Sequence, residues 1–258
     1  KRFLFFESDR MHLIGKNAAG IPNGIILDIW NQIQIENIAN AKRLLKKIFP
    51  EKEFVILFIG RSERRKGLPP LLEAMRKIKS EVSAGLVIAS VMSDEEYKWY
   101  EWGLKSMGLE KDVVIDRTWL SDLDKASLLC APDILALPSL YEPFGIVTLE
   151  GLAADYACER NGIVGPVVIT GATGGMSDVI RSGVDGFKVP VENFKIDSDL
   201  LASLIVMVLE HPELRKSISF NASQRVQSDI FRWERILKHV IRTYDHAIMN
   251  YVLWKEET

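Results

Sequence analysis

The stretch Phe54-Val55-Ile56-Leu57-Phe58-Ile59-Gly60 determines the fold class. It is a continuous apolar run closed by a glycine, which is typical of a strand buried on both faces of a sheet. Residues 71–79 follow with apolar side chains at helical spacing, and residues 86–89 form the next apolar run. A strand, a helix and a second strand at this spacing indicate a parallel βαβ unit.

The same alternation continues along most of the chain. Further strands are predicted over residues 86–89, 113–115, 134–137, 166–169 and 186–189, and helices over residues 71–79, 94–106, 122–130, 145–157, 200–209, 212–226 and 232–254. The chain is therefore predicted to be α/β, with a Rossmann-like doubly wound parallel sheet of about six strands and helices on both faces. Ligands of such sheets bind at the carboxyl ends of the strands, so the loops after Ile59, Leu137 and Ile169 are the candidate site.

Composition narrows the class of protein. The 258 residues carry 33 Lys and Arg against 35 Asp and Glu, so a net charge of −2 gives no basic field for nucleic acid. No apolar run reaches the length of a membrane span. Cys130 and Cys158 are too few for a disulfide framework or a thiolate metal site, so we expect core thiols, no bound metal and a cytoplasmic setting.

The domain organisation follows from the same patterns. Residues 1–50 are predicted to be a leading segment with a linker helix over 29–49, which Pro50 stops. Residues 51–258 are predicted to form one domain with a helical tail. Because the chain begins at Lys1, we expect it to be a domain of a longer protein.

The loop after the first strand, Gly60-Arg61-Ser62-Glu63-Arg64-Arg65-Lys66-Gly67, carries four cations. Arg and Lys side chains that reach a ligand from one side commonly bind a diphosphate. A solvated basic loop accounts for the same residues equally well. The loop has neither the G-x-G-x-x-G fingerprint of dinucleotide-binding folds nor the P-loop pattern.

The loop Pro138-Ser139-Leu140-Tyr141-Glu142-Pro143-Phe144-Gly145 leads into a helix that carries Glu150. A glycine at a helix start lets a ligand approach free N–H groups, which favour an anion. The two carboxylates can accept hydrogen bonds from sugar hydroxyls, although a solvated helix with an N-terminal acid is the alternative. Glu150 falls among apolar residues and therefore needs a partner. The paired glycines of Thr173-Gly174-Gly175 permit close approach of backbone, a weaker signal.

Taken in order, these motifs resemble one family. Arg61 with Lys66-Gly67, Glu142-x7-Glu150 after Pro138-Ser139, and Thr173-Gly174-Gly175 look like the C-terminal domain of a retaining family-four glycosyltransferase. The sequence Tyr141-Glu142-Pro143-Phe144-Gly145 resembles that of the glycogen and starch synthase branch, especially archaeal glycogen synthase. The resemblance runs from about residue 22 to the final helix and implies the C-terminal half of a two-domain GT-B fold.

The resemblance implies roles for particular residues. Arg61 and Lys66 would bind the diphosphate of the donor, ADP-glucose or UDP-glucose, and stabilise its charge without a metal ion or cofactor. Glu142 would contact the transferred sugar and, with Arg61 and Lys66, make up the catalytic set. Glu150 would hold the ribose, with the base near residues 117–119. The other donor-binding positions are Gly60, Phe144, Gly145, Ile146, Thr173, Gly174 and Gly175, which makes residues 51–258 a nucleotide-sugar-binding domain.

Two departures from the family pattern stand out. Gly151 replaces the usual alanine after the second glutamate, and Ala157–Ile163 is interpreted as a polar loop inserted before the fifth strand. The resemblance implies that a preceding domain holds the acceptor and a histidine near the transferred sugar. The four histidines here fall in none of the three loops. We therefore expect the chain to bind the donor and to transfer little sugar alone.

Several functions remain open at this point. The first is glucosyl transfer to an α-glucan acceptor held by the preceding domain. A second is a sucrose, trehalose or lipid-linked glycosyltransferase with the same donor site. A non-catalytic module that binds a nucleotide or sugar is a third, although the complete set of Arg61, Lys66, Glu142 and Glu150 argues against it. A nicotinamide-dependent oxidoreductase is weakest, because the glycine fingerprint is absent.

Overall fold

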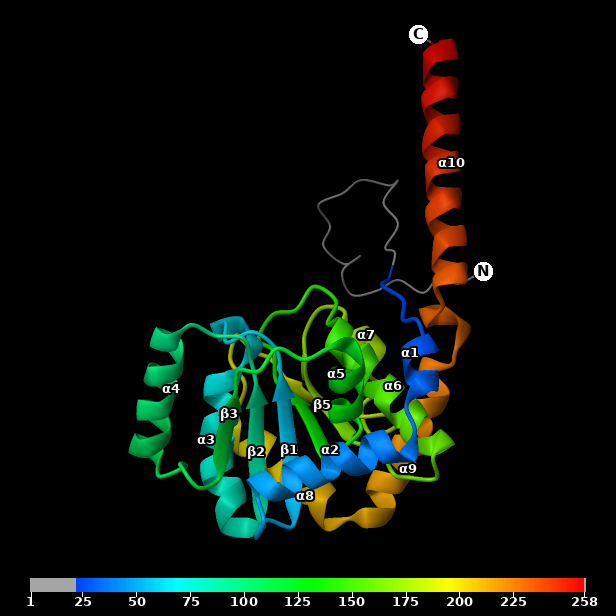
Figure 1. Cartoon of the computed structure of the whole chain (residues 1–258). Helices are drawn as coiled ribbons and strands as arrows, with labels where there is room; N and C mark the ends of the chain where they lie inside the picture. Colours follow the sequence, from blue (N-terminus) through cyan, green and yellow to red (C-terminus); the bar gives the residue numbers. More distant parts are fainter. Residues whose placement is uncertain (1–21, 258) are drawn as a thin grey trace.

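Six parallel strands form the sheet of the described chain, residues 22–257 of a computed structural model (Figure 1). The strands lie in the order β3-β2-β1-β4-β5-β6, the doubly wound order predicted above. The order in which successive strands are added therefore changes direction between β1 and β4, and this pair forms the topological switch point of the sheet. Their bounds are β1 Phe54–Ile59, β2 Ala84–Ala89, β3 Val113–Asp116, β4 Ile134–Leu137, β5 Val167–Ala172 and β6 Phe187–Pro190.

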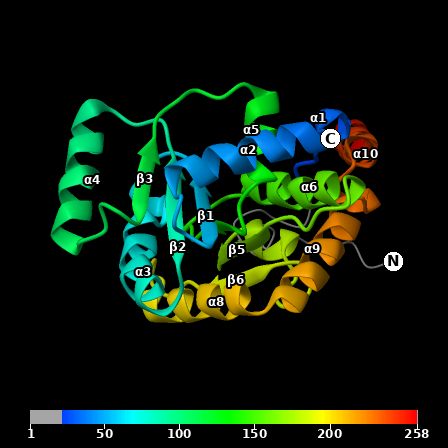
Figure 2. The same ribbon diagram turned by 60° about the horizontal axis from the view of Figure 1, so that its bottom comes forward.

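Helices cover both faces of this sheet (Figure 2). One layer contains α2, α5 and α6, and the other contains α3 and α8, while α4 lies beyond the edge strand β3. The helical elements are α1 Asp28–Gln32, α2 Ile35–Ile48, η2 Arg64–Lys66, α3 Leu68–Glu81, α4 Asp94–Met107, α5 Asp122–Leu129, α6 Ile146–Arg160, α7 Met176–Val179, α8 Ser198–Glu210, α9 Pro212–Val226, η3 Asp229–Phe231 and α10 Trp233–Glu257.

The central strands are apolar throughout because both of their faces are buried. Ile56 and Phe58 of β1 pack in the core with α3 and α8, whereas Leu57 packs in the core with α2, α5 and α6. Ile134 and Leu135 of β4 divide between the same two cores. Successive side chains of a strand point to opposite faces, so one apolar run serves two cores.

The linker helix predicted over residues 29–49 is instead two helices, α1 and α2. Ile33 is extended and buried at the break, and the side chain of Asn37 accepts a hydrogen bond from the backbone N–H of Gln34 at 2.9 Å. This new cap starts α2 and lets Ile33 point into the core. Trp30 and Leu45 are buried in the same cluster, so this segment packs on the domain.

The interpretation of Ala157–Ile163 as an inserted loop is wrong over its first part, because α6 continues to Arg160. Ala157 and Cys158 are fully buried. The polar residues that suggested a loop make contacts between elements instead: Glu159 accepts a hydrogen bond from Ser223 of α9, and the Asn161 amide donates to the carbonyl of Ile33 at 3.1 Å. Only the turn after Arg160 matches the prediction.

The third loop is shorter than predicted, since β5 runs on to Ala172 and the four-residue helix α7 begins at Met176. Ser121 caps α5 as predicted, accepting a hydrogen bond from the N–H of Asp124. The two cysteines are buried free thiols, also as predicted. No helix within residues 22–257 has the length and apolar character needed to cross a membrane.

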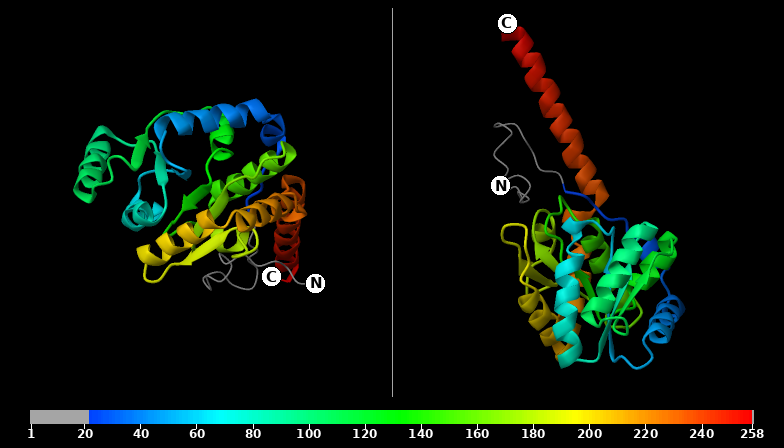
Figure 3. Two further views of the ribbon diagram at one scale, coloured as in Figure 1. Left: turned by 90° about the horizontal axis from the view of Figure 1, so that it is seen from below. Right: turned by 90° about the vertical axis from the view of Figure 1, so that its left-hand side faces the viewer.

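The final helix α10 projects from the body of the domain, at the end of the sheet where the strands finish (Figures 1 and 3). It carries an uncovered apolar row with four-, three- and four-residue spacing. The row comprises Leu237, Ile241, Tyr244 and Ile248, which are 52–68% exposed. The predicted continuation of this row, the side chain of Tyr251, lies outside the described side chains.

Candidate functional site

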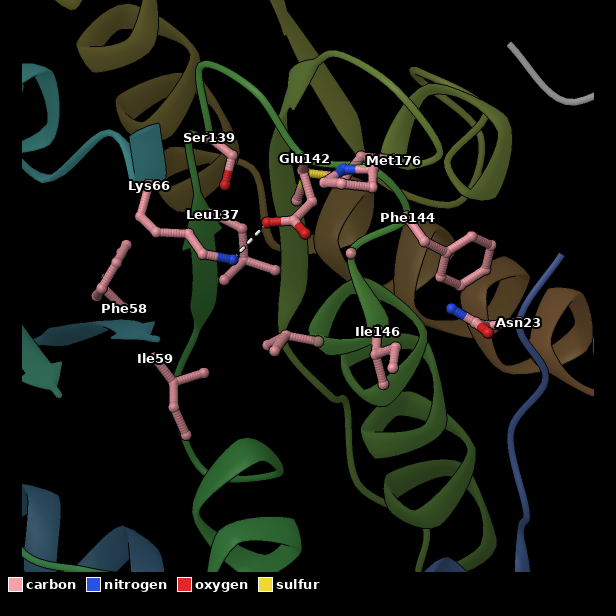
Figure 4. Close-up of a pocket in the computed structure, with 13 residues that line it drawn as sticks. Asn23, Phe58, Ile59, Lys66, Leu137, Ser139, Glu142, Phe144, Ile146 and Met176 are labelled. Atoms are coloured by element: carbon pink, nitrogen blue, oxygen red, sulfur yellow. Dashed lines mark hydrogen bonds and ion pairs between the residues drawn. The ribbon is translucent and has the colours of Figure 1, made fainter. Parts of the chain in front are cut away.

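A cavity of about 330 Å³ opens where β1 and β4 end, at the topological switch point of the sheet (Figure 4). This is where doubly wound sheets bind their ligands. The first two loops singled out by the sequence contribute to its wall, and the segment after β5 contributes Met176. Its lining comprises Asn23, Phe58, Ile59, Lys66, Leu137, Ser139, Glu142, Pro143, Phe144, Gly145, Ile146, Val147 and Met176.

The charged centre of the cavity is an ion pair between Lys66 and Glu142, whose side chains point toward each other (Figure 4). Arg65 adds a second cation, with its Nη1 3.3 Å from Glu142 Oε2. The carboxylate is only 12% exposed, and two cations compensate its burial. An anionic ligand entering here meets both cations and a carboxylate that can accept hydroxyl hydrogens.

Backbone contacts hold the two charged loops together. The N–H of Leu140 donates to the carbonyl of Arg65 at 2.7 Å. Gly67, which ends η2, adopts a left-handed φ of 77°, and a Cβ at this position would overlap the carbonyl oxygen of Pro138. Glycine is therefore required for the loop of Lys66 to lie against the loop of Glu142.

Gly145 starts α6 in a left-handed conformation, with a φ of 82°. A Cβ there would lie 2.6 Å from Met176 Cγ and 3.2 Å from Glu142 Cγ. The absence of a side chain brings the first turn of α6, with Ile146 and Val147, to the cavity wall. The positive end of the helix dipole therefore faces the cavity.

The third loop supports the second rather than lining the cavity itself. A Cβ on Gly174 would overlap the carbonyl oxygen of Glu142, and the N–H of Gly175 donates to the carbonyl of Pro143 at 3.1 Å. The two glycines thus allow the backbone after β5 to pack closely against the loop of Glu142. From the same segment, the side chain of Met176 reaches the cavity (Figure 4).

Arg61 lies outside the cavity lining. Its side chain is 69% exposed, and its Nη1 pairs with Glu63 Oε1 at 2.8 Å. Glu63 Oε2 pairs in turn with Arg65 Nε at 2.6 Å. A chain of alternating charges therefore connects Arg61 through Glu63 and Arg65 to Glu142 and Lys66.

Glu150, one turn into α6, has the partner that its burial requires. Lys125 of α5 places its Nζ 2.7 Å from Glu150 Oε1. Glu150 Oε2 is buried and has no hydrogen-bond partner within the described residues. The neighbouring Gly151 packs α6 tightly on the sheet, since a Cβ there would lie 2.7 Å from Val168 and 2.8 Å from Leu135. The alanine that the resemblance leads us to expect here would require Val168 and Leu135 to shift.

A family model described as "Glycosyl transferases group 1" matches residues 41–225. The chain belongs to the group 1 glycosyl transferases. Within this family, the chain is 32% identical over 198 residues to an uncharacterized glycosyltransferase of Methanocaldococcus jannaschii, covering 77% of this chain and 46% of the relative. It is 27% identical over 242 residues to phosphatidyl-myo-inositol mannosyltransferase of Mycolicibacterium smegmatis, covering 92% and 54%.

Solved structures share the fold of this group 1 domain. The C-terminal domain of a group 1 family protein (LpcC) from Francisella tularensis superposes with a TM-score of 0.65 at 21% identity, covering 80% of this chain and 98% of that domain. Anabaena HepE in complex with UDP-glucose superposes with a TM-score of 0.71 at 21% identity, covering 88% and 57%. The fold is that of a GT-B C-terminal domain, as predicted. The chain spans about half the length of the curated relatives it matches.

The comparisons support the family but not the narrower branch. A mannosyltransferase with a phosphatidylinositol name is among the relatives, so membership of group 1 does not select the archaeal glycogen synthases. The predicted branch is therefore finer than the findings support. The family model supports a group 1 glycosyltransferase domain.

The structure brings together some of the predicted site residues of this glycosyltransferase domain. Lys66, Glu142, Phe144, Gly145 and Ile146 line the cavity. The predicted positions that do not line it are Gly60, Arg61, Glu150, Thr173, Gly174 and Gly175. Their donor-binding roles remain predictions.

The sequence did not mark three residues at this site, of which Ser139 and Asn23 line the cavity and Arg65 contacts the lining residue Glu142. Arg65 contacts Glu142, yet its position beside Lys66 in a run of cations gave no sign of that contact. Ser139 lay inside a quoted loop but received no role. Asn23 comes from the segment before α1, and no pattern connected it with this site.

The described histidines lie away from the cavity. His211 precedes α9, with its Nδ1 2.6 Å from the carbonyl oxygen of Met207, and His239 and His246 lie on α10. His12 falls outside the described residues. Within residues 22–257, no three His, Cys, Asp or Glu side chains come together as candidate metal ligands.

Proposed function

We propose that this group 1 domain binds the nucleotide-sugar donor of a retaining glycosyltransferase that transfers glucose from ADP-glucose or UDP-glucose to an α-glucan. The observation that carries the proposal is the Lys66–Glu142 pair in a cavity at the topological switch point of the sheet. A sugar diphosphate needs a cation for the phosphates and an acceptor for the sugar hydroxyls, and this pair supplies both.

Lys66 and Glu142 contact different parts of the donor when it binds. The ammonium of Lys66 exchanges Glu142 for a phosphate oxygen, which leaves the carboxylate to accept a hydroxyl hydrogen of the transferred sugar. Arg65 stays within reach of both groups. Arg61 joins them only by leaving Glu63, to which it is now paired.

The transfer step needs stabilisation of the departing diphosphate. Negative charge grows on the phosphate oxygens as the bond from the sugar carbon to the diphosphate breaks. Preorganised cations and the first N–H groups of α6 stabilise that charge in the transition state. Lys66 and the start of α6 line the same cavity, in support of this role.

A lipid-linked acceptor is the second candidate. The 27% identity to a phosphatidyl-myo-inositol mannosyltransferase over 92% of this chain favours it. The donor site would be the same, and the acceptor would be selected elsewhere in the protein. Assays of the whole protein with glycogen and with a phosphoinositide as acceptors separate the two candidates.

The exposed apolar row on α10 supports an acceptor domain beside this one. Leu237, Ile241, Tyr244 and Ile248 together form a longer exposed apolar stripe than a solvated helix needs. We infer that the acceptor domain covers this row and closes the donor cavity. The 258 residues alone are then expected to bind the donor with little transfer, and robust transfer by them would contradict this inference.

Calorimetric titration of the chain with ADP, UDP, ADP-glucose and UDP-glucose tests the proposal. A Lys66→Met variant is expected to bind the donor about 1.5–3 kcal/mol more weakly, the scale of a hydrogen bond to a charged group. Lys77→Met is the matched control, because Lys77 lies on α3 near Asp199 and away from the cavity. Binding unaffected by Lys66→Met would reject the site, and no binding of any of the four ligands would reject donor binding by this chain.

A further inference from the structure

The ion pair between Lys125 and Glu150 joins α5 to α6 beside the donor cavity. The Lys125 Nζ lies 2.7 Å from Glu150 Oε1, and the two side chains are 30% and 19% exposed. Lys125 is absent from the residues that the family resemblance marks. An ammonium this close to a buried carboxylate is either a structural counter-ion or part of a ligand site.

The direction of both side chains favours a ligand site. Long side chains of a helix lean toward its N-terminus, so Glu150 covers the turn that begins with Ile146 and Val147. Those two residues line the cavity. By the same rule we expect Lys125 to lean toward the start of α5, which follows the end of β3. We therefore expect both charged groups to point to the edge of the sheet where the strands finish.

The two carboxylate oxygens of Glu150 differ in access. Oε2 is enclosed and has no hydrogen-bond partner among the described residues. A ligand can therefore approach this carboxylate only from the side of Oε1, where the ammonium of Lys125 already lies. A hydroxyl that donates to Oε1 also comes within reach of Lys125.

We propose that Lys125 is a nucleotide-binding residue that acts with Glu150 on the two ribose hydroxyls. This inference rests on the proposed donor site. A carboxylate only accepts hydrogen bonds and an ammonium only donates them, whereas each hydroxyl of a vicinal diol can do both. Glu150 accepts from one hydroxyl while Lys125 donates to the oxygen of the other. The pair therefore recognises an intact ribose diol.

Titration of the chain with UDP and ADP, and with their 2′-deoxy and 3′-deoxy analogues, tests the inference. The wild-type chain is expected to prefer the ribonucleotides, and Lys125→Met is expected to weaken their binding about 10- to 100-fold. The distinguishing result is that Lys125→Met binds one deoxy analogue as well as the parent nucleotide. Lys125→Arg retains charge and donors, so it is expected to recover most of the preference.

Further variants exclude a merely structural effect. Lys125→Met with Glu150→Gln leaves no unpaired buried charge, and it is expected to fold as the wild type does and to bind ribo- and deoxynucleotides alike. Lys77→Met is expected to behave as the wild type. If Lys125→Met keeps both the affinity and the preference of the wild type, the role of Lys125 is rejected while the donor site stands. If the wild type binds neither UDP nor ADP, the proposed function fails and this inference fails with it.

Discussion

Replacement of Gly67 by alanine is expected to separate the two charged loops of the proposed donor site. The left-handed φ of 77° at this position costs a residue with a Cβ about 1–2 kcal/mol. The new Cβ would also overlap the carbonyl oxygen of Pro138, which is backbone and cannot rotate away. Overpacking of this kind costs about 1–3 kcal/mol. The expected loss in free energy of unfolding is therefore about 2–5 kcal/mol.

Gly162 provides the matched control, because it has a φ of 69° and a Cβ there would meet nothing within 4 Å. Gly162→Ala is expected to lower the free energy of unfolding only by the cost of the left-handed φ, about 1–2 kcal/mol. Urea denaturation followed by circular dichroism measures both variants. The difference between them isolates the cost of forcing the loops apart.

The same substitution is expected to weaken donor binding, since Lys66 immediately precedes Gly67 and Glu142 lies on the displaced loop. Gly162→Ala should leave donor affinity unchanged. If Gly67→Ala were no less stable than Gly162→Ala, the close approach of the two loops would not contribute to the fold, and the reasoning would be refuted.

Three further predictions concern Asp155, Cys130 and Asp133. Burial raises the pKa of Asp155 well above its usual value, so the folded state retains a proton that the unfolded state releases. Stability is therefore lost as the pH rises from the unfolded pKa of about 4 through the folded pKa, and the advantage of Asp155→Asn in urea denaturation should grow between pH 5 and pH 8. An equal advantage at both pH values would contradict this. The hydrogen bond of the Cys130 thiol with Cys158 and its burial both raise its pKa, so this thiol should react with a thiol reagent only after unfolding; rapid reaction of the native protein would show that it is accessible. Asp133 accepts hydrogen bonds from the N–H of Val55 at 2.9 Å and from Arg215 at 2.6 Å, so Asp133→Ala should cost about 2 kcal/mol in the same denaturation assay. A loss below about 0.5 kcal/mol would mean that water replaces both contacts.

The strands and most helices of this domain could be predicted from the sequence because local patterns encode them. The run from Phe54 to Ile59 is apolar at every position, since both faces of β1 are buried, and its observed bounds equal the predicted ones. Ser121 and the residues after it predicted the start of α5. The doubly wound class of the sheet followed from this alternation, and the position of the cavity followed from the rule for parallel sheets.

Errors arose where a residue serves a contact between distant segments. Glu159 and Asn161 suggested a loop because their partners, Ser223 and the carbonyl of Ile33, are remote in sequence. Ile33 interrupts a helical pattern because its side chain is buried in the core, and the neighbouring residues in the sequence do not indicate this break.

The candidate site was predictable only in part. Glu142 and Lys66 stand out because they flank the ends of the two central strands. Arg65 and Lys125 do not, since their contacts with Glu142 and Glu150 depend on how the loops and helices pack. The sequence predicted that Glu150 needs a partner, but it contained nothing that identified Lys125.

The most direct test of the donor site is a crystal structure of the chain with bound UDP-glucose. We predict that the diphosphate lies within hydrogen-bond distance of Lys66 Nζ and at the start of α6, with Glu142 released from Lys66 and directed at the sugar. A nucleotide bound at another face of the domain, with the Lys66–Glu142 pair unchanged, would contradict it.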